Sequence, residues 1–228
     1  MRNLGKIVLH IPAREGSKRV PKKNIRLMNN KPMVSYTIEA SIKANITKEM
    51  YVNTDDTEVI DYVLNTYPDF KIYKRDKKLA DDKASSEDFN YDIIKKLNAD
   101  TLIMINPVCP LIGEKDIINA FESYRNSDCD TLITSISTQM QTFCDNEPVN
   151  ININTPLAPS QDNKTISILN WAITIWDGNL FKERMQKRNY ASLGEKRLLF
   201  DIDPLHSIKV SEEKDFIFAE KLLKYLSN

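Results

Sequence analysis

Six basic residues gather around one early turn of the chain, although Lys plus Arg and Asp plus Glu balance at 32 each over the whole sequence. The turn lies in the stretch IPAREGSKRVPKKNIR, residues 11–26, which contains the single acid Glu15. A bound triphosphate needs cations at one fixed place, and an Arg fork can bind two of its oxygens at once. The alternative is a solvated charge run, and spacing alone does not choose between them. The six are Arg14, Lys18, Arg19, Lys22, Lys23 and Arg26.

Glycine is scarce, with five residues in the chain. Neither the dinucleotide fingerprint G-x-G-x-x-G nor the phosphate loop G-x-x-x-x-G-K-[ST] occurs. If phosphate binds at the basic turn, side-chain cations must therefore contribute more than a bare backbone nest.

Composition narrows the class of protein. A chain of 228 residues predicts one domain spanning 1–228. A net charge of zero argues against bulk nucleic-acid binding, so any affinity for anions must be local. Three cysteines without metal-ligand spacing favour reduced thiols, and no signal peptide or membrane-length apolar run is found. We therefore expect a cytoplasmic protein with neither a nucleic-acid nor a membrane partner.

Strands and helices alternate along the chain. The predicted helices lie at 31–45, 56–67, 85–98, 114–126, 177–189 and from 211 onward, with Asp55 or Asp56, Ser85 or Ser86, and Ser211 as N-caps. The predicted strands are 5–12, 50–56, 70–74, 100–107, 129–137, 166–176, 197–203 and 206–210.

These strands are apolar throughout and do not alternate between apolar and polar residues. This pattern predicts an α/β fold with a mostly parallel sheet covered on both faces. Ligands of such sheets bind at the carboxyl ends of the strands, where the basic turn and the segment NPVCP would meet. The polar, Asn-rich segment 140–167 interrupts the alternation. It is either a hairpin excursion for dimer contact or a long surface loop.

Several motifs occur in the order found in one enzyme family. IPAREGSKRVPKKNI resembles the signature IPAR-x-GSK-x-x-P-x-KNI of the CMP-sialic acid synthetases, within the wider group of CMP-sugar cytidylyltransferases. VNTDD is similar to the family's VSTDD, KRDKKLADDKASSED to its R-x-x-x-LA-x-D-x-ASS, and INPVCPLI to its LQPTSPLR. LNWAITI and the closing DPLHSIKVSEEKDFIFAEKLL also have counterparts, so the resemblance covers nearly the whole chain.

The resemblance implies a Rossmann-like three-layer α/β/α domain with a small dimerisation excursion, and a homodimer. The implied reaction joins CMP from CTP to a small acidic acceptor and releases pyrophosphate, with Mg²⁺ as cofactor. By motif position, the catalytic residues are Arg14 and Lys23; the nucleotide-binding residues are Ser17, Lys18, Asn24, Arg75 and Ser86; the acceptor-binding residues are Asn106, Gln161 and Asn170.

Each assignment outside the basic turn has a structural alternative. Arg75 lies in a charge run and could be solvated, and Ser86 could only cap the following helix. Asn106 could cap a strand end before Pro107, and Asn170 could be an ordinary buried amide.

The chain departs from the family at the metal site. Lys209 and Ser211 stand where the family has the two carboxylates of its DID motif. A protonated Lys cannot bind Mg²⁺, a cation that seeks oxygen ligands, although its ammonium could replace part of the metal's charge. A literal DID at 201–203 makes Asp203 a candidate ligand; alternatively the triphosphate holds the metal, or the enzyme is impaired.

The acceptor side departs as well. Ile112 replaces an arginine of the family, Ser160 and Ile168 replace two more, and Trp171 replaces a glycine. The loss of guanidinium forks removes bidentate carboxylate recognition, so we expect an acceptor other than a standard sialic acid. The competing hypothesis is a catalytically impaired relative that binds CTP or CMP and acts as a partner or regulatory protein.

Overall fold

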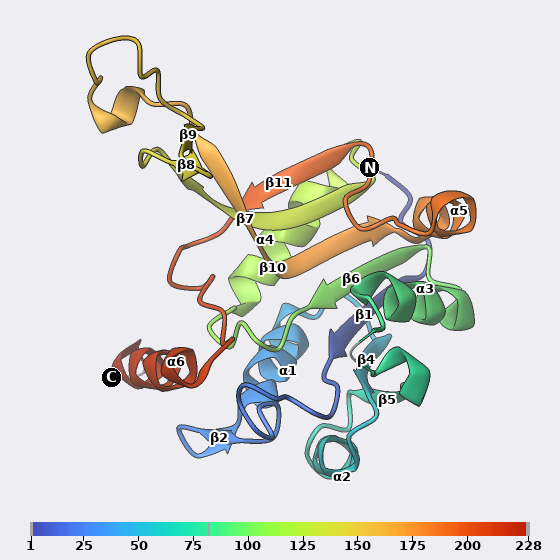
Figure 1. Ribbon diagram of the computed structural model, residues 1–228. Helices are drawn as coiled ribbons and strands as arrows, with labels where there is room; N and C mark the ends of the chain where they lie inside the picture. The colour runs from blue at the N-terminus through green and yellow to red at the C-terminus, as the bar shows by residue number, and fades with distance from the viewer. Residues whose placement is uncertain (1, 82, 227–228) are drawn as a thin grey trace.

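The computed structural model describes residues 2–81 and 83–226, and its centre is a seven-stranded sheet of order β11-β7-β10-β6-β1-β4-β5 (Figure 1). Strand β10 runs antiparallel to β6 and β7, while the other pairs of the sheet are parallel. The mostly parallel sheet is therefore confirmed. Its strands are β1 Ile7–Pro12, β4 Met50–Thr54, β5 Lys71–Lys74, β6 Thr101–Ile105, β7 Thr131–Thr138, β10 Ile166–Asp177 and β11 Arg197–Asp201.

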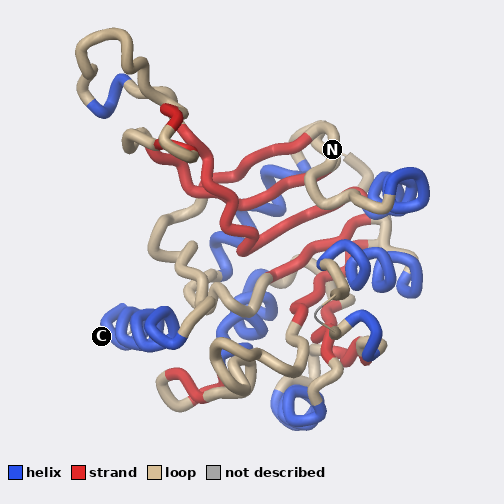
Figure 2. Tube along the Cα trace, in the orientation of Figure 1, coloured by secondary structure: helices blue, strands red, loops and turns tan. Residues whose placement is uncertain are grey.

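Helices cover both faces of the sheet and make the three predicted layers (Figures 1 and 2). One face packs against α1 Met33–Ala44, α2 Thr57–Thr66 and α4 Glu114–Arg125. The other packs against α3 Ser86–Leu97 and α5 Gly178–Arg188, which contact each other. A third cluster joins α6 Glu213–Leu226 to the short β2–β3 hairpin, Leu27–Met28 and Lys31–Pro32.

The strands are largely apolar on both sides because helices cover both faces of the sheet. In β6, Leu102 and Met104 contribute to the cluster under α3 and α5, while Ile103 and Ile105 contribute to the cluster under α1, α2 and α4. Successive side chains of a strand point to opposite faces, so a sheet buried on both sides needs apolar residues at every position.

Helix caps agree with the sequence at two helices and differ at a third. The Asp56 carboxylate accepts the amides of Glu58 and Val59, and Ser85 forms a capping box at the start of α3. The predicted cap at Ser211 is wrong, because α6 begins at Glu213, two residues after Ser211; the Asp215 carboxylate in its first turn accepts the Ser211 and Glu212 amides, each at 2.9 Å. Residues 206–210, predicted as a strand, form a turn and an irregular segment that belongs to none of the described strands and packs in the cluster of α6.

Segment 140–167 leaves the body of the protein beyond β7 and returns as the start of β10 (Figure 1). It contains the hairpin β8 Phe143–Cys144 and β9 Glu147–Pro148, and the 3₁₀ turn Ser160–Asp162. A small hairpin is thus followed by an irregular, mostly exposed stretch, and its role in dimer contact stays a prediction. Asn150 fixes its base, since its side-chain amide donates to the Met140 and Lys164 carbonyls.

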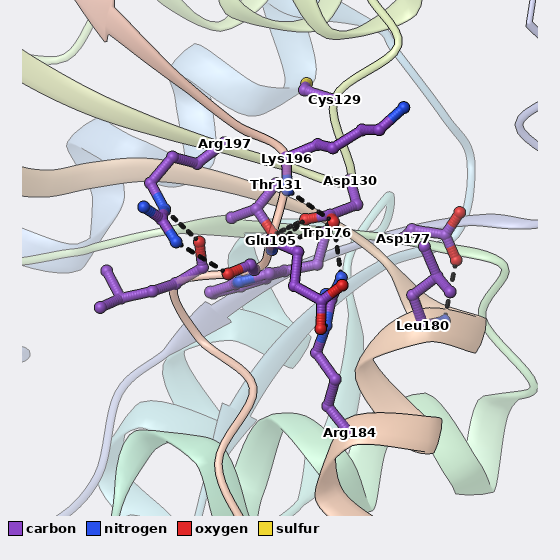
Figure 3. Close-up of polar contacts among 12 residues, drawn as sticks. Cys129, Asp130, Thr131, Trp176, Asp177, Leu180, Arg184, Glu195, Lys196 and Arg197 are labelled. Atoms are coloured by element: carbon purple, nitrogen blue, oxygen red, sulfur yellow. Dashed lines mark hydrogen bonds and ion pairs between the residues drawn. The ribbon is translucent and has the colours of Figure 1, made fainter.

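A buried carboxylate holds the segment between α5 and β11 in place (Figure 3). Asp130, at the start of β7, accepts Arg184 at 2.5 Å, the Lys196 amide at 2.9 Å and the Thr131 hydroxyl at 2.9 Å. Gly194 lies so close, at φ +63°, that a Cβ there would meet Asp130 Oδ1 at 2.1 Å. Burial would raise the pKa of Asp130, but these hydrogen bonds together lower it.

We predict that Asp130→Asn lowers the free energy of unfolding by about 3–5 kcal/mol, because it leaves the buried Arg184 guanidinium without its carboxylate. Urea titration followed by circular dichroism measures the loss. The control is Asp128→Asn, which removes an exposed partner of Lys196 and should cost far less stability, because exposed ion pairs are screened by solvent. The lowered pKa of Asp130 stabilises the fold above its unfolded-state pKa near ~3.9, and this contribution is lost as the pH falls through the folded-state value. The wild type should therefore lose more stability on acidification than Asp130→Asn; equal losses would contradict the assigned role.

Candidate active site at the carboxyl ends of the strands

A cleft of about 1060 Å³ opens where β1 and β6 end and where β10 bends. Its lining comes from the basic turn after β1, the start of α3, the residues after β6, the bend of β10, the segment after α5 and residues 209–211. The cleft thus lies at the carboxyl ends of the parallel strands, as the sheet topology predicts.

The basic turn is anchored to the neighbouring strand before it enters the cleft. The Ala13 amide donates to the Asn53 carbonyl at 2.9 Å, and the Thr54 hydroxyl donates to the Ala13 carbonyl at 2.6 Å. The Glu15 amide then donates to Asp55, and Gly16 turns the chain at φ +80°, a conformation that glycine adopts without a steric penalty. Asp55 therefore holds the turn, a role that the sequence did not suggest.

Six cationic side chains line this cleft, and Glu87 is its one acid among the described residues. The Glu87 carboxylate is engaged, because it accepts the Ala191 and Ser192 amides at 2.7 and 2.8 Å. The cleft is therefore suited to a highly charged anion. The six cations are Arg14, Lys18, Arg19, Lys23, Arg75 and Lys209.

Lys23 joins three segments of the site. Its ammonium donates to the Val210 carbonyl at 3.0 Å, and the Val210 amide donates to the Val108 carbonyl at 2.8 Å. Burial lowers the pKa of Lys23, and the charges of Arg19 and Lys209 lower it further. A bound polyanion would raise the pKa of Lys23 again, because it would neutralise the charges of Arg19 and Lys209.

Arg75 forms the buried floor of the site. It is 4% exposed, and its guanidinium donates to the Asn53 side chain at 2.8 Å and to the Asn53 carbonyl at 2.9 Å. It also lies 4.3 Å from the ring centroid of Phe89. Burial lowers the pKa of Arg75 to about 10, although the negative charge of Asp55 acts to raise it. Beneath it, burial and the Arg75 charge lower the pKa of His10 to about 3, so His10 is neutral at pH 7.

The structure gathers most of the residues selected from the sequence. Besides Arg14, Lys18, Lys23 and Arg75, the lining contains Ser17, Asn24, Ser86 and Asn106. The cap of α3 is Ser85, which leaves the Ser86 side chain outside that role. Asn24 also positions the turn, because its amide donates to the Arg14 carbonyl at 3.0 Å.

Three selected residues lie elsewhere. Gln161 is exposed on the excursion, where its carbonyl accepts the Gln139 side chain. Asp203 is exposed and accepts the Leu205 amide, and it does not line the cleft. Asn170 is buried just behind the lining, where its Oδ1 accepts the Thr134 hydroxyl at 2.6 Å.

The donor groups do not fit a divalent metal held by the protein. Within residues 2–81 and 83–226, no group of three or more His, Cys, Asp or Glu side chains could hold a metal ion. The cleft presents ammonium and guanidinium groups, whereas Mg²⁺ binds carboxylate and carbonyl oxygens. Buried Cys109, where the family has serine, is no substitute ligand at neutral pH, because burial raises the pKa of its thiol to about 12.

The cleft also has apolar walls, which include Trp171, the residue that replaces a family glycine. Trp171 lines the cleft with φ +58°, in the left-handed region, where a bulky residue costs about 1–2 kcal/mol. Met104, Leu169, Phe89 and Leu193 also line it. Sequence reasoning missed these apolar residues, because nothing in their local pattern separates a cleft wall from an ordinary core.

The described part of the chain contains no helix that is long and apolar enough to cross a membrane. Its three cysteines, Cys109, Cys129 and Cys144, are free thiols.

Solved structures resemble this fold. The structure of CMP:2-keto-3-deoxy-manno-octonic acid synthetase complexed with CTP matches with a TM-score of 0.70 at 16% identity, covering 97% of this chain and all of that one. The 4-diphosphocytidyl-2C-methyl-D-erythritol synthase of Anaerococcus prevotii matches with a TM-score of 0.68 at 14% identity, covering 96% of each chain. At sequence identities of 16% and 14%, these matches show a shared fold and no more.

Sequence comparison adds the family. The chain is 29% identical to post-translational flagellin modification protein B of Campylobacter coli, over 97% of this chain and 96% of that protein. It is 36% identical to the pseudaminic acid cytidylyltransferase of Campylobacter jejuni over 50% and 51%, and 26% identical to the N-acylneuraminate cytidylyltransferase of Escherichia coli over 94% and 51%. These two matches span about half the length of each relative. A family model described as Cytidylyltransferase matches residues 8–172, so the chain belongs to the cytidylyltransferase family.

Proposed function

We propose that this protein transfers CMP from CTP to a hydroxyl of a small acidic sugar. The observation that carries the proposal is the convergence of six cations on one cleft in a member of this family. The acceptor oxygen attacks the α-phosphorus in line, the bond from that phosphorus to the bridging oxygen breaks, and pyrophosphate leaves with the bond's electron pair. The hydroxyl proton goes to solvent. Such a reaction needs mainly positioning and charge neutralisation, which the cleft supplies.

The cations divide between two roles in this proposal. Arg14, Lys18 and Lys23 bind the triphosphate, with the Ser17 hydroxyl beside them and Asn24 holding the Arg14 backbone. Arg75 and Ser86 face the nucleoside, where Phe89 keeps the Arg75 guanidinium in place. Asn106 faces the acceptor or the α-phosphate from the end of β6.

Magnesium enters this proposal as part of the Mg·CTP substrate, held by triphosphate oxygens. The side chains of the cleft do not favour a metal ion held by the protein itself. A role of Asp203 as a metal ligand stays a prediction. Lys209 lies near Lys23 and adds positive charge at the position of a family carboxylate. It thereby takes over part of the neutralisation that a metal would provide.

The acceptor is proposed to be an acidic sugar other than a standard sialic acid, in the pathway of a surface glycan. Cytidylyltransferases for pseudaminic and N-acylneuraminic acids among the similar proteins support the class. Ile112 is buried at 3% exposure and brings no charge where the family has an arginine, which supports the departure.

A homodimer in the cytoplasm is the proposed working form. Segment 140–167 exposes Met140, Phe143, Ile153 and Leu157 at 74, 53, 60 and 64% on a projection away from the sheet, and free thiols suit a reducing compartment. Light scattering after size-exclusion chromatography should give twice the chain mass, and Leu157→Glu should lower it. A monomeric wild type at micromolar concentration would contradict this form.

A catalytically impaired CTP-binding protein is the second candidate, favoured by Lys209 and Ser211 at carboxylate positions. Calorimetry with CTP, with and without Mg²⁺, followed by a pyrophosphate assay over a panel of acidic sugars, separates the two. Binding together with pyrophosphate release supports the enzyme. Binding without release for any acceptor would support the silent relative, and no binding would defeat both.

Lys23→Ala should lower kcat/KM for CTP about 100-fold with little change in thermal stability, because the lost hydrogen bond to Val210 is offset by removal of a cation from a crowded group. Lys22→Ala is the matched control: Lys22 is exposed, pairs with Glu58 and does not line the cleft. Its kcat/KM should stay within about threefold of the wild type. Full turnover by Lys23→Ala would remove Lys23 from the mechanism.

Lys209→Gln should move the alkaline limb of the pH profile of kcat/KM for CTP to higher pH. Burial, Arg19 and Lys209 lower the pKa of Lys23, so loss of the Lys209 charge lets Lys23 keep its proton to higher pH. Lys23→Arg is the control, because a guanidinium does not titrate there and the limb should disappear. An alkaline limb that stays in place in both variants would show that Lys23 does not set it.

A further inference from the structure

Trp171 occupies a backbone position that is unfavourable for its side chain. It lies at φ +58° in the bulge of β10, where the register against β7 shifts between Leu169 and Thr174. Residues with a Cβ adopt this region rarely, and bulky ones more rarely still. A strained residue of this kind inside a cleft is a reason to ask what its side chain contacts there.

The neighbouring hydrogen bonds keep Trp171 in this conformation. The Asn170 side chain accepts the Ala172 amide at 3.0 Å and the Thr134 hydroxyl at 2.6 Å. The Ala172 carbonyl accepts the Asn106 amide at 2.8 Å, which joins the bulge to the end of β6. Because both flanking residues are fixed, the bulge imposes the left-handed conformation at position 171 whichever residue stands there.

The surroundings of Trp171 are apolar. Its half-buried side chain packs against the cluster beneath α3 and α5 and lines the cleft together with Met104, Leu169 and Leu193; we call these four residues the apolar wall. Within the described lining, the cations come from the basic turn, from the end of β5 and from residue 209, and none comes from β10 or the segment after α5. The cleft therefore has a cationic part and an apolar part.

Resting on the proposed function, we propose that Trp171 determines acceptor specificity by stacking its indole on an apolar face of the acidic sugar. Deoxy carbons and N-acyl methyl groups bury apolar surface against the ring. Hydroxyl groups at the same place would lose water without gaining a partner, which is unfavourable. The preferred substrate class is thus an acidic sugar in which acylamino and deoxy positions replace ring and side-chain hydroxyls.

The test compares two acceptors, N,N′-diacetyllegionaminate and the more hydroxylated N-acetylneuraminate, at saturating CTP. The wild type should favour the first in kcat/KM. The preference should fall about tenfold in Trp171→Ala and Trp171→Gly, mainly through the acceptor KM, and should be largely kept in Trp171→Phe. The KM for CTP should not change, which separates specificity from general damage to the site.

Two controls keep the outcome interpretable. Leu199→Ala changes an exposed apolar residue of β11 that does not line the cleft, and it should leave the preference unchanged. Trp171→Gly should unfold at a higher temperature than Trp171→Ala, because both lose the ring while glycine alone relieves the strain at positive φ.

Tryptophan fluorescence tests the contact without turnover. The second tryptophan, Trp176, is 1% exposed, so acceptor added in the presence of CTP should change the emission of the wild type but not that of Trp171→Phe. If no acceptor supports pyrophosphate release, the proposed function fails, and the titration still shows whether the ring contacts the sugar. An unchanged preference in the Ala and Gly variants, or an emission change that persists without Trp171, would overturn the specificity role.

Discussion

Repulsion among cations around one cleft is the constraint on which the site depends. Six positive side chains line it, and the one acid of the described lining is turned to backbone amides. Such a group would spread apart on a mobile loop, but the basic turn is fixed to β4 and residue 210 is fixed to the end of β6. The sheet therefore holds the charges in place until an anion compensates them, and it is in this sense preorganised for a triphosphate.

The second layer of support lies outside the cleft. Asp130 draws the segment after α5 against the start of β7, and Glu87 holds the Ala191 and Ser192 amides (Figure 3 shows the Asp130 contacts). Leu193 is thereby positioned in the apolar wall. The cationic and apolar parts of the cleft thus rest on different networks, and a change in one need not disturb the other.

The sequence predicted the layers, the element order and most of the cleft because apolar strands, Asp and Ser caps and clustered cations are local signals. It failed at residues 206–210, which have an apolar, strand-like pattern but pack beneath α6 in place of pairing with a strand. It failed at Ser211 because the first turn of α6 begins at Glu213, with the Asp215 carboxylate accepting the amides of Ser211 and Glu212. The strain at Trp171 could not be read from local residues, since the bulge that imposes it arises from register with β7 and β6.

The contact from Lys23 to Val210 closes the site across almost the full length of the chain. Residues 209–211 are synthesised long after the basic turn, so a nascent chain on the ribosome carries the early cations without their late partners. During this interval the half-built cleft has no Lys209 and no Val210 carbonyl to receive Lys23. A cleft with all six cations in place therefore exists only after residues 209–211 have been synthesised.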